Sequence, residues 1–252
     1  MIPYLKVGQR LCTWCYIFAF ALGGCKSGYH IKTVSTELYP VHQGLADSAI
    51  IEFYRPFKAG LDSQMNTVVA ISKVEITRSQ PEGPLNNLVA DAMADVAAAH
   101  NIAFDMVHTN YKGLRRSLPQ GELKTYHVYE LMPFENYLVT LQLRGDQVQT
   151  LFDYMAANGG DPISKATFRI KNRKAVDVVL NGRALDAAKT YTILTSDYLA
   201  NGGDEASVYL EGRNRTDLPL KLRDVILSYL RKLNDGGRMI DPKADGRIKS
   251  DN

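Results

Sequence analysis

The sequence predicts an α+β domain, because segments with helical and strand-like patterns follow one another in irregular order along it. Hydrophobic residues make up 45% of the 252 residues and charged residues 23%, a globular balance that argues against disorder along the whole chain. The sequence contains no repeat of fixed period and no low-complexity block. We therefore expect one domain over residues 46–252.

The first half of this domain contains its clearest helix. Between Pro84 and His100, apolar residues recur at helical spacing, with alanines between them. From Val68 to Ile76, apolar residues partly alternate with polar ones, which indicates a strand. Prolines and a glycine make residues 78–84 a predicted loop. The other elements expected here are one or two short helices over 46–66 around Pro56, a strand over 104–107, a polar loop over 110–121, a helix that Thr125 caps and Pro133 ends, and a strand over 137–143.

The second half begins with a helix predicted over Asp146 to Ala157. Asn158-Gly159-Gly160 is a typical helix end, because glycine adopts the left-handed backbone of a C-terminal cap. Asn181-Gly182 indicates a turn between strands. The remaining elements expected in this half are strands over 167–170, 176–180 and 191–195, and an amphipathic helix over Leu218 to Leu233.

Residues 1–24 are predicted to be a lipoprotein signal peptide. Lys6 and Arg10 precede an apolar stretch over 11–22, which is shorter than the ~20 residues of a spanning helix. The stretch ends in Leu22-Gly23-Gly24-Cys25, which resembles the lipobox of bacterial lipoproteins and makes Cys25 the expected lipidated residue. Two alternatives remain open, an ordinary signal peptide with a chance cysteine and a short membrane anchor that is never cut.

Residues 25–45 are expected to be a polar tether to the membrane. Lys26 follows the cysteine, in place of the aspartate that commonly retains lipoproteins in the inner membrane. We therefore expect a lipid anchor in the outer membrane, with the domain facing the periplasm. The formal net charge of +3, without any basic run, argues against a nucleic-acid partner.

Five short segments carry a resemblance to a known family. They occur in family order within residues 68–249, and only their combination is specific. The segments are Asn86 to Met93, Asn110 to Arg115, Leu131 to Phe134, Tyr198 to Asp204, and Asp245 to Lys249. Together they resemble the C-terminal, substrate-recognition domain of the 5′-nucleotidase and 2′,3′-cyclic phosphodiesterase family. The resemblance implies a single domain in which helices pack on a mixed sheet.

The resemblance also implies a nucleoside site. The base would lie between the rings of Phe134 and Tyr198, where tyrosine replaces the usual phenylalanine, and stacking of this kind provides about 1–3 kcal/mol per base. Asp204 would accept hydrogen bonds from the ribose hydroxyls. Before it, Gly202 and Gly203 would allow positive φ and close backbone approach. The alternative is that both rings belong to the core and that the glycine turn is a plain loop.

The loop from Asn110 to Arg115 would contact the rest of a nucleotide. By resemblance, Asn110 would face the base or the sugar, and Arg115 would bind phosphate with its two-pronged guanidinium. Tyr111 and Lys112 stand where the family usually has glycine. The family usually has a second phosphate-binding arginine before the helix, but Gln80-Pro81-Glu82 occupies that position here, and Arg78 lies nearby in a different register. The sequence therefore leaves open weaker phosphate binding, a differently phosphorylated nucleotide or a nucleoside ligand.

No metal site and no catalytic residue is expected in this chain. The family's hydrolysis uses a separate N-terminal domain with two metal ions, and its D-x-H and N-H-[DE] segments are missing here. We expect Asp105 and His108 to be structural. The sequence thus favours a nucleotide-recognition subunit whose divalent metals lie in a separate metallophosphatase. The alternatives are a binding lipoprotein without catalysis, a hydrolase that uses Asp105, His108 and Asp204, and a degenerate interaction domain.

Overall fold

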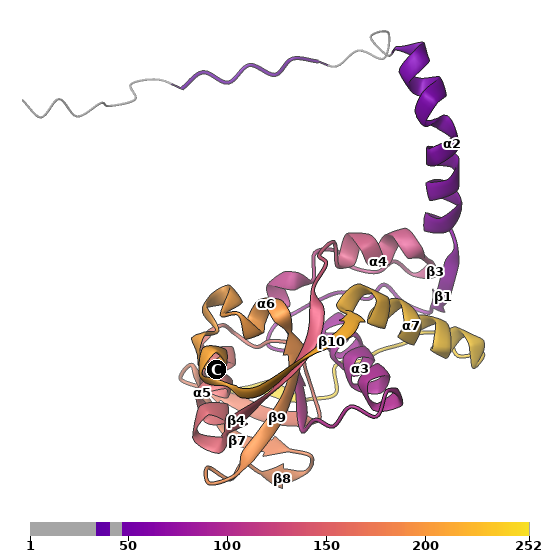
Figure 1. The fold of residues 1–252 in the computed structure, drawn as a ribbon. Helices are drawn as coiled ribbons and strands as arrows, with labels where there is room; N and C mark the ends of the chain where they lie inside the picture. Colours follow the sequence, from indigo (N-terminus) through magenta and orange to yellow (C-terminus); the bar gives the residue numbers. More distant parts are fainter. Residues whose placement is uncertain (1–33, 41–46, 252) are drawn as a thin grey trace, which may run out of the picture. The chain divides into compact units, whose positions relative to one another are not determined.

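The computed structural model describes residues 34–40 and 47–251 (Figure 1). Residues 34–40 contain neither helix nor strand, and the compact unit that follows begins at Glu52. The predicted signal peptide, Cys25 and the predicted end of the tether at residue 45 lie outside the described residues. Within the described residues, no helix has both the length and the apolar character needed to cross a membrane.

The structure combines helices with three separate sheets. The helices are α2 (Ser48–Met65), α3 (Pro84–Ala99), α4 (Thr125–Leu131), α5 (Gly145–Ala157), α6 (Asp197–Ala200) and α7 (Leu222–Asp235), with 3-10 turns η2 (Tyr111–Gly113), η3 (Gly203–Glu205) and η4 (Ser207–Glu211). The strands are β1 (Val68–Ser72), β2 (Met106–His108), β3 (Gly121–Lys124), β4 (Tyr137–Arg144), β5 (Ile163–Ser164), β6 (Ala166–Lys171), β7 (Lys174–Leu180), β8 (Arg183–Ala184), β9 (Thr190–Ser196), β10 (Arg213–Lys221) and β11 (Ile248–Ser250).

Two of the three sheets are mixed, which confirms the predicted α+β class with its mixed sheet. The central sheet has the order β10-β4-β9-β2-β5, in which β2 and β9 are parallel and the other neighbours are antiparallel. The second sheet has the order β11-β6-β7-β8, with β11 parallel to β6. The pair β1-β3 is antiparallel.

The central sheet separates two hydrophobic clusters. Neighbouring residues of a strand point to opposite faces of the sheet, so Leu138 and Leu194 pack into one cluster while Val139 and Ile193 pack into the other. The first cluster is completed by α3, α4 and α7, and the second by α5, β6 and β7. Both faces of the sheet are therefore buried, which leaves its edges and loops to carry a site.

Helix α3 is buried almost completely around its circumference. It begins with Pro84 and ends at Ala99, as the apolar spacing predicts. Asn86 and Asn87 are also buried, because their amide groups donate to the carbonyl oxygen of Ser79 and to Glu82 and Lys243. The two asparagines thus connect α3 to the loop before it and to the C-terminal segment.

Several predicted elements differ from the observed ones. The strand predicted to reach Ile76 ends at Ser72, and α7 begins at Leu222, because residues 213–221 form β10. Most side chains of β10 are exposed, so it lacks the alternation that indicates a strand. Thr125 is the first residue of α4 and not its cap, since Lys124 precedes the helix and donates its backbone N–H to His127.

Candidate functional site

One pocket gathers most of the predicted site residues. It has a volume of about 740 Å³, and five of the predicted residues line it, namely Asn110, Arg115, Phe134, Tyr198 and Asp204. The remaining predicted residues, Gly202 and Gly203, lie in the turn before Asp204 and do not line the pocket. Residues from three separate stretches of sequence therefore meet at one place.

The sheet topology explains why these stretches meet. Because β2 and β9 are parallel, their carboxyl ends lie at the same edge of the central sheet, and Asn110 and Tyr198 follow those ends. Strand β4 is antiparallel to β9, so its amino end lies at this edge too, just after Phe134. Helix α6 and the turn η3 continue from β9 and bring Asp204 back to the pocket.

The two aromatic rings are not core residues. Phe134 is 37% exposed and Tyr198 is 42% exposed, whereas the core aromatic Phe152 is fully buried. The guanidinium carbon of Arg115 lies 5.5 Å from the centroid of the Phe134 ring. Both rings thus line the pocket and remain partly exposed, and a positive charge lies beside one of them.

Asp204 stands at the centre of a hydrogen-bond network. Its carboxylate accepts from the Asn110 side-chain amide at 2.7 Å and from the Tyr198 hydroxyl at 2.9 Å. Its carbonyl oxygen accepts from the Tyr154 hydroxyl at 2.8 Å. Each carboxylate oxygen can accept about two hydrogen bonds, so the network fixes the carboxylate and leaves capacity for further donors. The bond to Asp204 raises the pKa of Tyr198.

The paired glycines permit this arrangement. Gly202 has φ +82°, which favours glycine, and Asp204 itself has the left-handed φ of 52°. A Cβ on Gly203 would lie 2.6 Å from two ring carbons of Tyr198. Gly203 therefore leaves room for the Tyr198 ring, and the close backbone approach of the glycine pair to a ligand stays a prediction.

Gly203→Ala should displace the Tyr198 ring and destabilise the domain. Relief of so close a contact costs about 1 kcal/mol or more. Urea unfolding should show a lower midpoint for this variant. Gly60→Ala is the matched control, because nothing lies within 4 Å of the Cβ that it adds. Equal urea midpoints for both variants would mean that the turn accommodates the added methyl group without loss of stability.

The loop that carries Asn110 is held from two sides. Arg78 donates to the carbonyl oxygens of Tyr111 and Leu114, at 3.2 and 2.5 Å, and its guanidinium lies 4.6 Å from the centroid of the Tyr111 ring. On the other side, the carboxylate of Asp161 accepts from the backbone N–H of Tyr111 at 2.9 Å. Arg78 therefore positions the loop and does not line the pocket.

A buried polar cluster supports the same loop. His108 is fully buried, with one ring nitrogen 2.6 Å from the Tyr209 hydroxyl and the other 3.3 Å from the carboxylate of Asp161. Burial raises the pKa of both Tyr209 and Tyr154 above the usual value, so their hydroxyls stay protonated. No sequence pattern indicates a role for Tyr154, Asp161 or Tyr209, because their partners are distant along the chain.

The histidine and aspartate that one alternative uses for hydrolysis have structural partners. Asp105 accepts from the backbone N–H of Thr192 at 2.7 Å, and His108 belongs to the buried cluster. Neither lines the pocket. Over residues 34–40 and 47–251, no group of three or more histidine, cysteine, aspartate or glutamate side chains is arranged to hold a metal ion.

Glu135 fixes the segment that carries Phe134. Its carboxylate forms ion pairs with Lys221 and Arg223 at the start of α7. Hydrogen bonds from these two cations lower the pKa of Glu135 from 4.5 to about 2. The aromatic segment is thereby held to the same helix terminus over a wide pH range.

Glu135→Gln should lower the melting temperature at neutral pH and have less effect in acid. Since the folded-state pKa is depressed, the carboxylate contributes stability above pH 4.5, and this contribution is lost as pH falls towards about 2. Thermal melts at several pH values measure this difference. In Glu130→Gln, which removes an α4 carboxylate without an ion pair in the described structure, the difference should be small at every pH.

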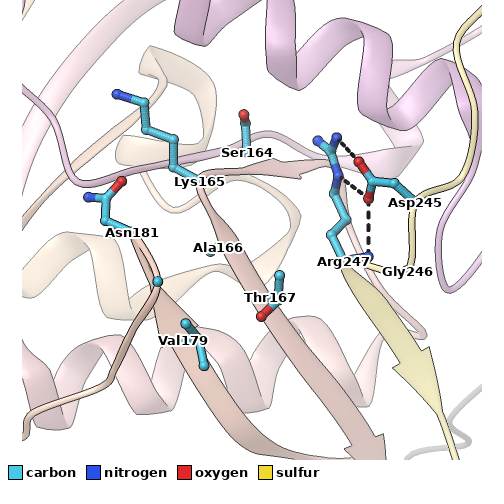
Figure 2. Close-up of a pocket in the computed structure, with 10 residues that line it drawn as sticks. Ser164, Lys165, Ala166, Thr167, Val179, Asn181, Asp245, Gly246 and Arg247 are labelled. Carbon is cyan, nitrogen blue, oxygen red and sulfur yellow. Dashed lines mark hydrogen bonds and ion pairs between the residues drawn. The ribbon is translucent and has the colours of Figure 1, made fainter.

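A second pocket, of about 510 Å³, lies beside the four-stranded sheet (Figure 2). On its rim, Arg247 pairs with Asp245 at 2.6 Å and with Asp91 of α3 at 2.9 Å. Glu82 accepts from the backbone N–H groups of Asp245 and Gly246. The closing segment that carries part of the family resemblance therefore secures the C-terminus to α3.

Comparisons with known proteins identify the fold and the matched region. The structure defines the class of protein as an α+β domain with a pocket at one edge of its central sheet. The family described as 5′-nucleotidase, C-terminal domain, matches residues 66–211, which is more than half of the chain. The chain therefore belongs to the 5′-nucleotidase C-terminal domain family.

Individual relatives agree with this assignment. The chain is 29% identical to the trifunctional nucleotide phosphoesterase protein YfkN of Bacillus subtilis, over 77% of this chain and 14% of that protein. It is 25% identical to a 5′-nucleotidase-related protein of Glossina morsitans morsitans, over 96% of this chain and 48% of that protein. The 5′-nucleotidase precursor of Thermus thermophilus superposes with a TM-score of 0.67 at 25% identity, over 80% of this chain and 42% of that one. The chain thus spans less than half the length of these relatives.

Proposed function

We propose that this protein recognises a nucleoside or nucleotide for a 5′-nucleotidase-type hydrolase system in nucleotide salvage. The observation that carries the proposal is the pocket that Phe134 and Tyr198 share with Asp204. Two partly exposed rings in one pocket suit a flat base, because stacking binds aromatic faces without demanding particular polar atoms. The carboxylate in the same pocket suits the hydroxyls of a sugar.

Arg115 supports a phosphorylated ligand. It lines the same pocket as Asp204 and also the neighbouring depression that Arg78 and Arg116 border. A guanidinium can bind two phosphate oxygens at once. Because Arg78 is engaged with the loop carbonyls, Arg115 is the arginine proposed to bind phosphate, and phosphate should add less affinity than the base.

The hydrolytic chemistry is proposed to come from elsewhere. The described residues contain no candidate dimetal site, and the family that matches residues 66–211 is described as the C-terminal domain of 5′-nucleotidase. We propose a separate metallophosphatase as partner, with the divalent metals in that partner. The domain would be anchored in the outer membrane through lipid on Cys25 and face the periplasm.

A thermal-shift panel of nucleosides and nucleotides on the full chain tests the recognition role. A ligand that binds only the folded state raises the melting temperature increasingly as its concentration exceeds its Kd. We expect a purine or pyrimidine nucleoside to raise it and free ribose phosphate to have little effect. No shift with any nucleoside or nucleotide would refute the proposal.

A phosphatase assay on the same protein, with and without added divalent metal, tests the division of labour. We expect ligand binding without turnover by this chain alone. Metal-dependent turnover would favour the self-sufficient hydrolase. Binding without any effect on an added metallophosphatase would favour a lipoprotein that only captures the ligand.

A further inference from the structure

The carboxylate of Asp204 is presented to the pocket from a left-handed stretch of backbone. Asp204 and Glu205 have φ values of 52° and 65°, and Gly202 before them has φ +82°. Residues with a Cβ disfavour the left-handed region, so two of them in succession must be held there by surrounding contacts. The contacts that hold this turn therefore decide where the carboxylate points.

Two tyrosine hydroxyls hold the backbone of Asp204. Its N–H donates to the Tyr198 hydroxyl at 3.2 Å, and its carbonyl oxygen accepts from the Tyr154 hydroxyl at 2.8 Å. Tyr198 lines the pocket, so a ligand there would contact it directly. Tyr154 is half-buried and does not line the pocket, so it can act on a ligand only through the turn that it holds.

The ring of Tyr154 is fixed by the core of the domain. It packs against the second hydrophobic cluster, and its neighbours Leu151 and Met155 on α5 are fully buried. It also meets the buried ring of His108 edge-on, with centroids 6.5 Å apart. Groups on a well-packed helix are placed more precisely than groups on a loop. The Tyr154 hydroxyl is therefore a fixed reference point for the turn that carries Asp204.

The same surroundings position the other polar group of the pocket. The carboxylate of Asp161 lies 3.3 Å from the His108 ring and accepts from the backbone N–H of Tyr111, the residue after Asn110. Asn110 in turn donates to the Asp204 carboxylate at 2.7 Å. The turn of Asp204 and the loop of Asn110 are thus both held by groups that contact His108, and this shared support aligns the two polar side chains.

We propose that Tyr154 is a positioning residue that sets the preference of the pocket for ligands with free ribose hydroxyls. The inference rests on the proposed function, in which Asp204 accepts those hydroxyls. Hydrogen bonds weaken steeply as their angle departs from the best geometry, so a carboxylate that accepts from two hydroxyls must be aimed at both. Loss of the Tyr154 hydroxyl releases the Asp204 carbonyl and misaligns the sugar acceptor, whereas the stacking rings keep their own supports.

Tyr154→Phe in the full chain removes this hydroxyl and keeps the ring that packs on the cluster. Calorimetric titration with adenosine and uridine, each compared with its 2′,3′-dideoxy analogue, measures the preference. We expect the variant to bind the ribonucleosides about threefold to tenfold more weakly, which corresponds to the loss of one neutral hydrogen bond. Binding of the dideoxy analogues should stay nearly unchanged. A preference equal to that of the wild type would overturn the inference.

Tyr191→Phe is the matched control for a purely structural effect. Tyr191 packs against the same hydrophobic cluster, and its hydroxyl accepts from the backbone N–H of Asp186 at 2.9 Å, away from the pocket. This variant should lower the urea midpoint and keep the wild-type preference. If Tyr154→Phe weakens ribonucleosides and dideoxy analogues equally, or if both variants change the preference alike, Tyr154 only stabilises the domain and the inference is wrong.

A double-mutant cycle tests whether Tyr154 acts through Asp204. In the Asp204→Asn background, Tyr154→Phe should cause no further loss of the ribose preference, and additive losses would contradict the inference. If the wild type prefers ribonucleosides and Tyr154→Phe keeps that preference, only the role of Tyr154 is wrong. If the wild type binds no nucleoside at all, the proposed function is wrong and the inference falls with it.

Discussion

Replacing Phe134 and Tyr198 together with alanine should abolish nucleoside binding and leave the domain folded. Each stacked ring contributes about 1–3 kcal/mol per base, so the double variant loses about 2–6 kcal/mol of binding free energy. Both side chains are partly exposed, so their truncation leaves no cavity in either hydrophobic cluster. Phe134→Ala also removes the ring beside Arg115.

Calorimetry and thermal shift with the best ligand of the panel would measure this loss. Tyr137→Ala is the matched control, because Tyr137 is a similarly exposed aromatic residue at the start of β4 that does not line the pocket. Its variant should bind as the wild type does. If the double variant shifts like the wild type, the rings do not hold the base.

The resemblance predicted the composition of the pocket better than local patterns predicted its neighbouring strands. Asn110, Phe134, Tyr198 and Asp204 occur in short segments with fixed spacing, so they could be recognised without a fold. Strand β10 could not be predicted from the sequence, because its mostly exposed residues do not alternate between apolar and polar with the period of two that a half-buried strand shows. It becomes a strand through its pairing with β4, and that pairing is a long-range contact.

The sequence did not identify the residues that support the site, for a related reason. Arg78 was out of register with the family's second arginine, yet its side chain reaches the carbonyl oxygens of Tyr111 and Leu114. Tyr154 and Asp161 act on Asp204 and Tyr111 from helix α5 and the loop after it. Sequence spacing reports neighbours on one element, whereas these contacts depend on how separate elements pack.

Asp204→Asn should weaken binding of ribonucleosides by about 10-fold to 150-fold. Hydrogen bonds to a charged group contribute about 1.5–3 kcal/mol, and the amide that replaces the carboxylate carries no charge and only one acceptor oxygen. The variant also places an NH₂ group where the carboxylate now accepts from Asn110 or Tyr198. Calorimetric titration of wild type and variant would measure the change in Kd.

A comparison of ligands distinguishes contact with the sugar from a structural role of Asp204. If the carboxylate accepts the ribose hydroxyls, the wild type should prefer a ribonucleoside to its 2′,3′-dideoxy analogue, and Asp204→Asn should remove most of that preference. Tyr198→Phe, which keeps the ring face and the charge of Asp204 but deletes one donor to it, should retain the preference. An equal loss of affinity for both ligands in Asp204→Asn would mean that the carboxylate only holds the loop of Asn110 and the ring of Tyr198 in place, and the sugar would then need another acceptor.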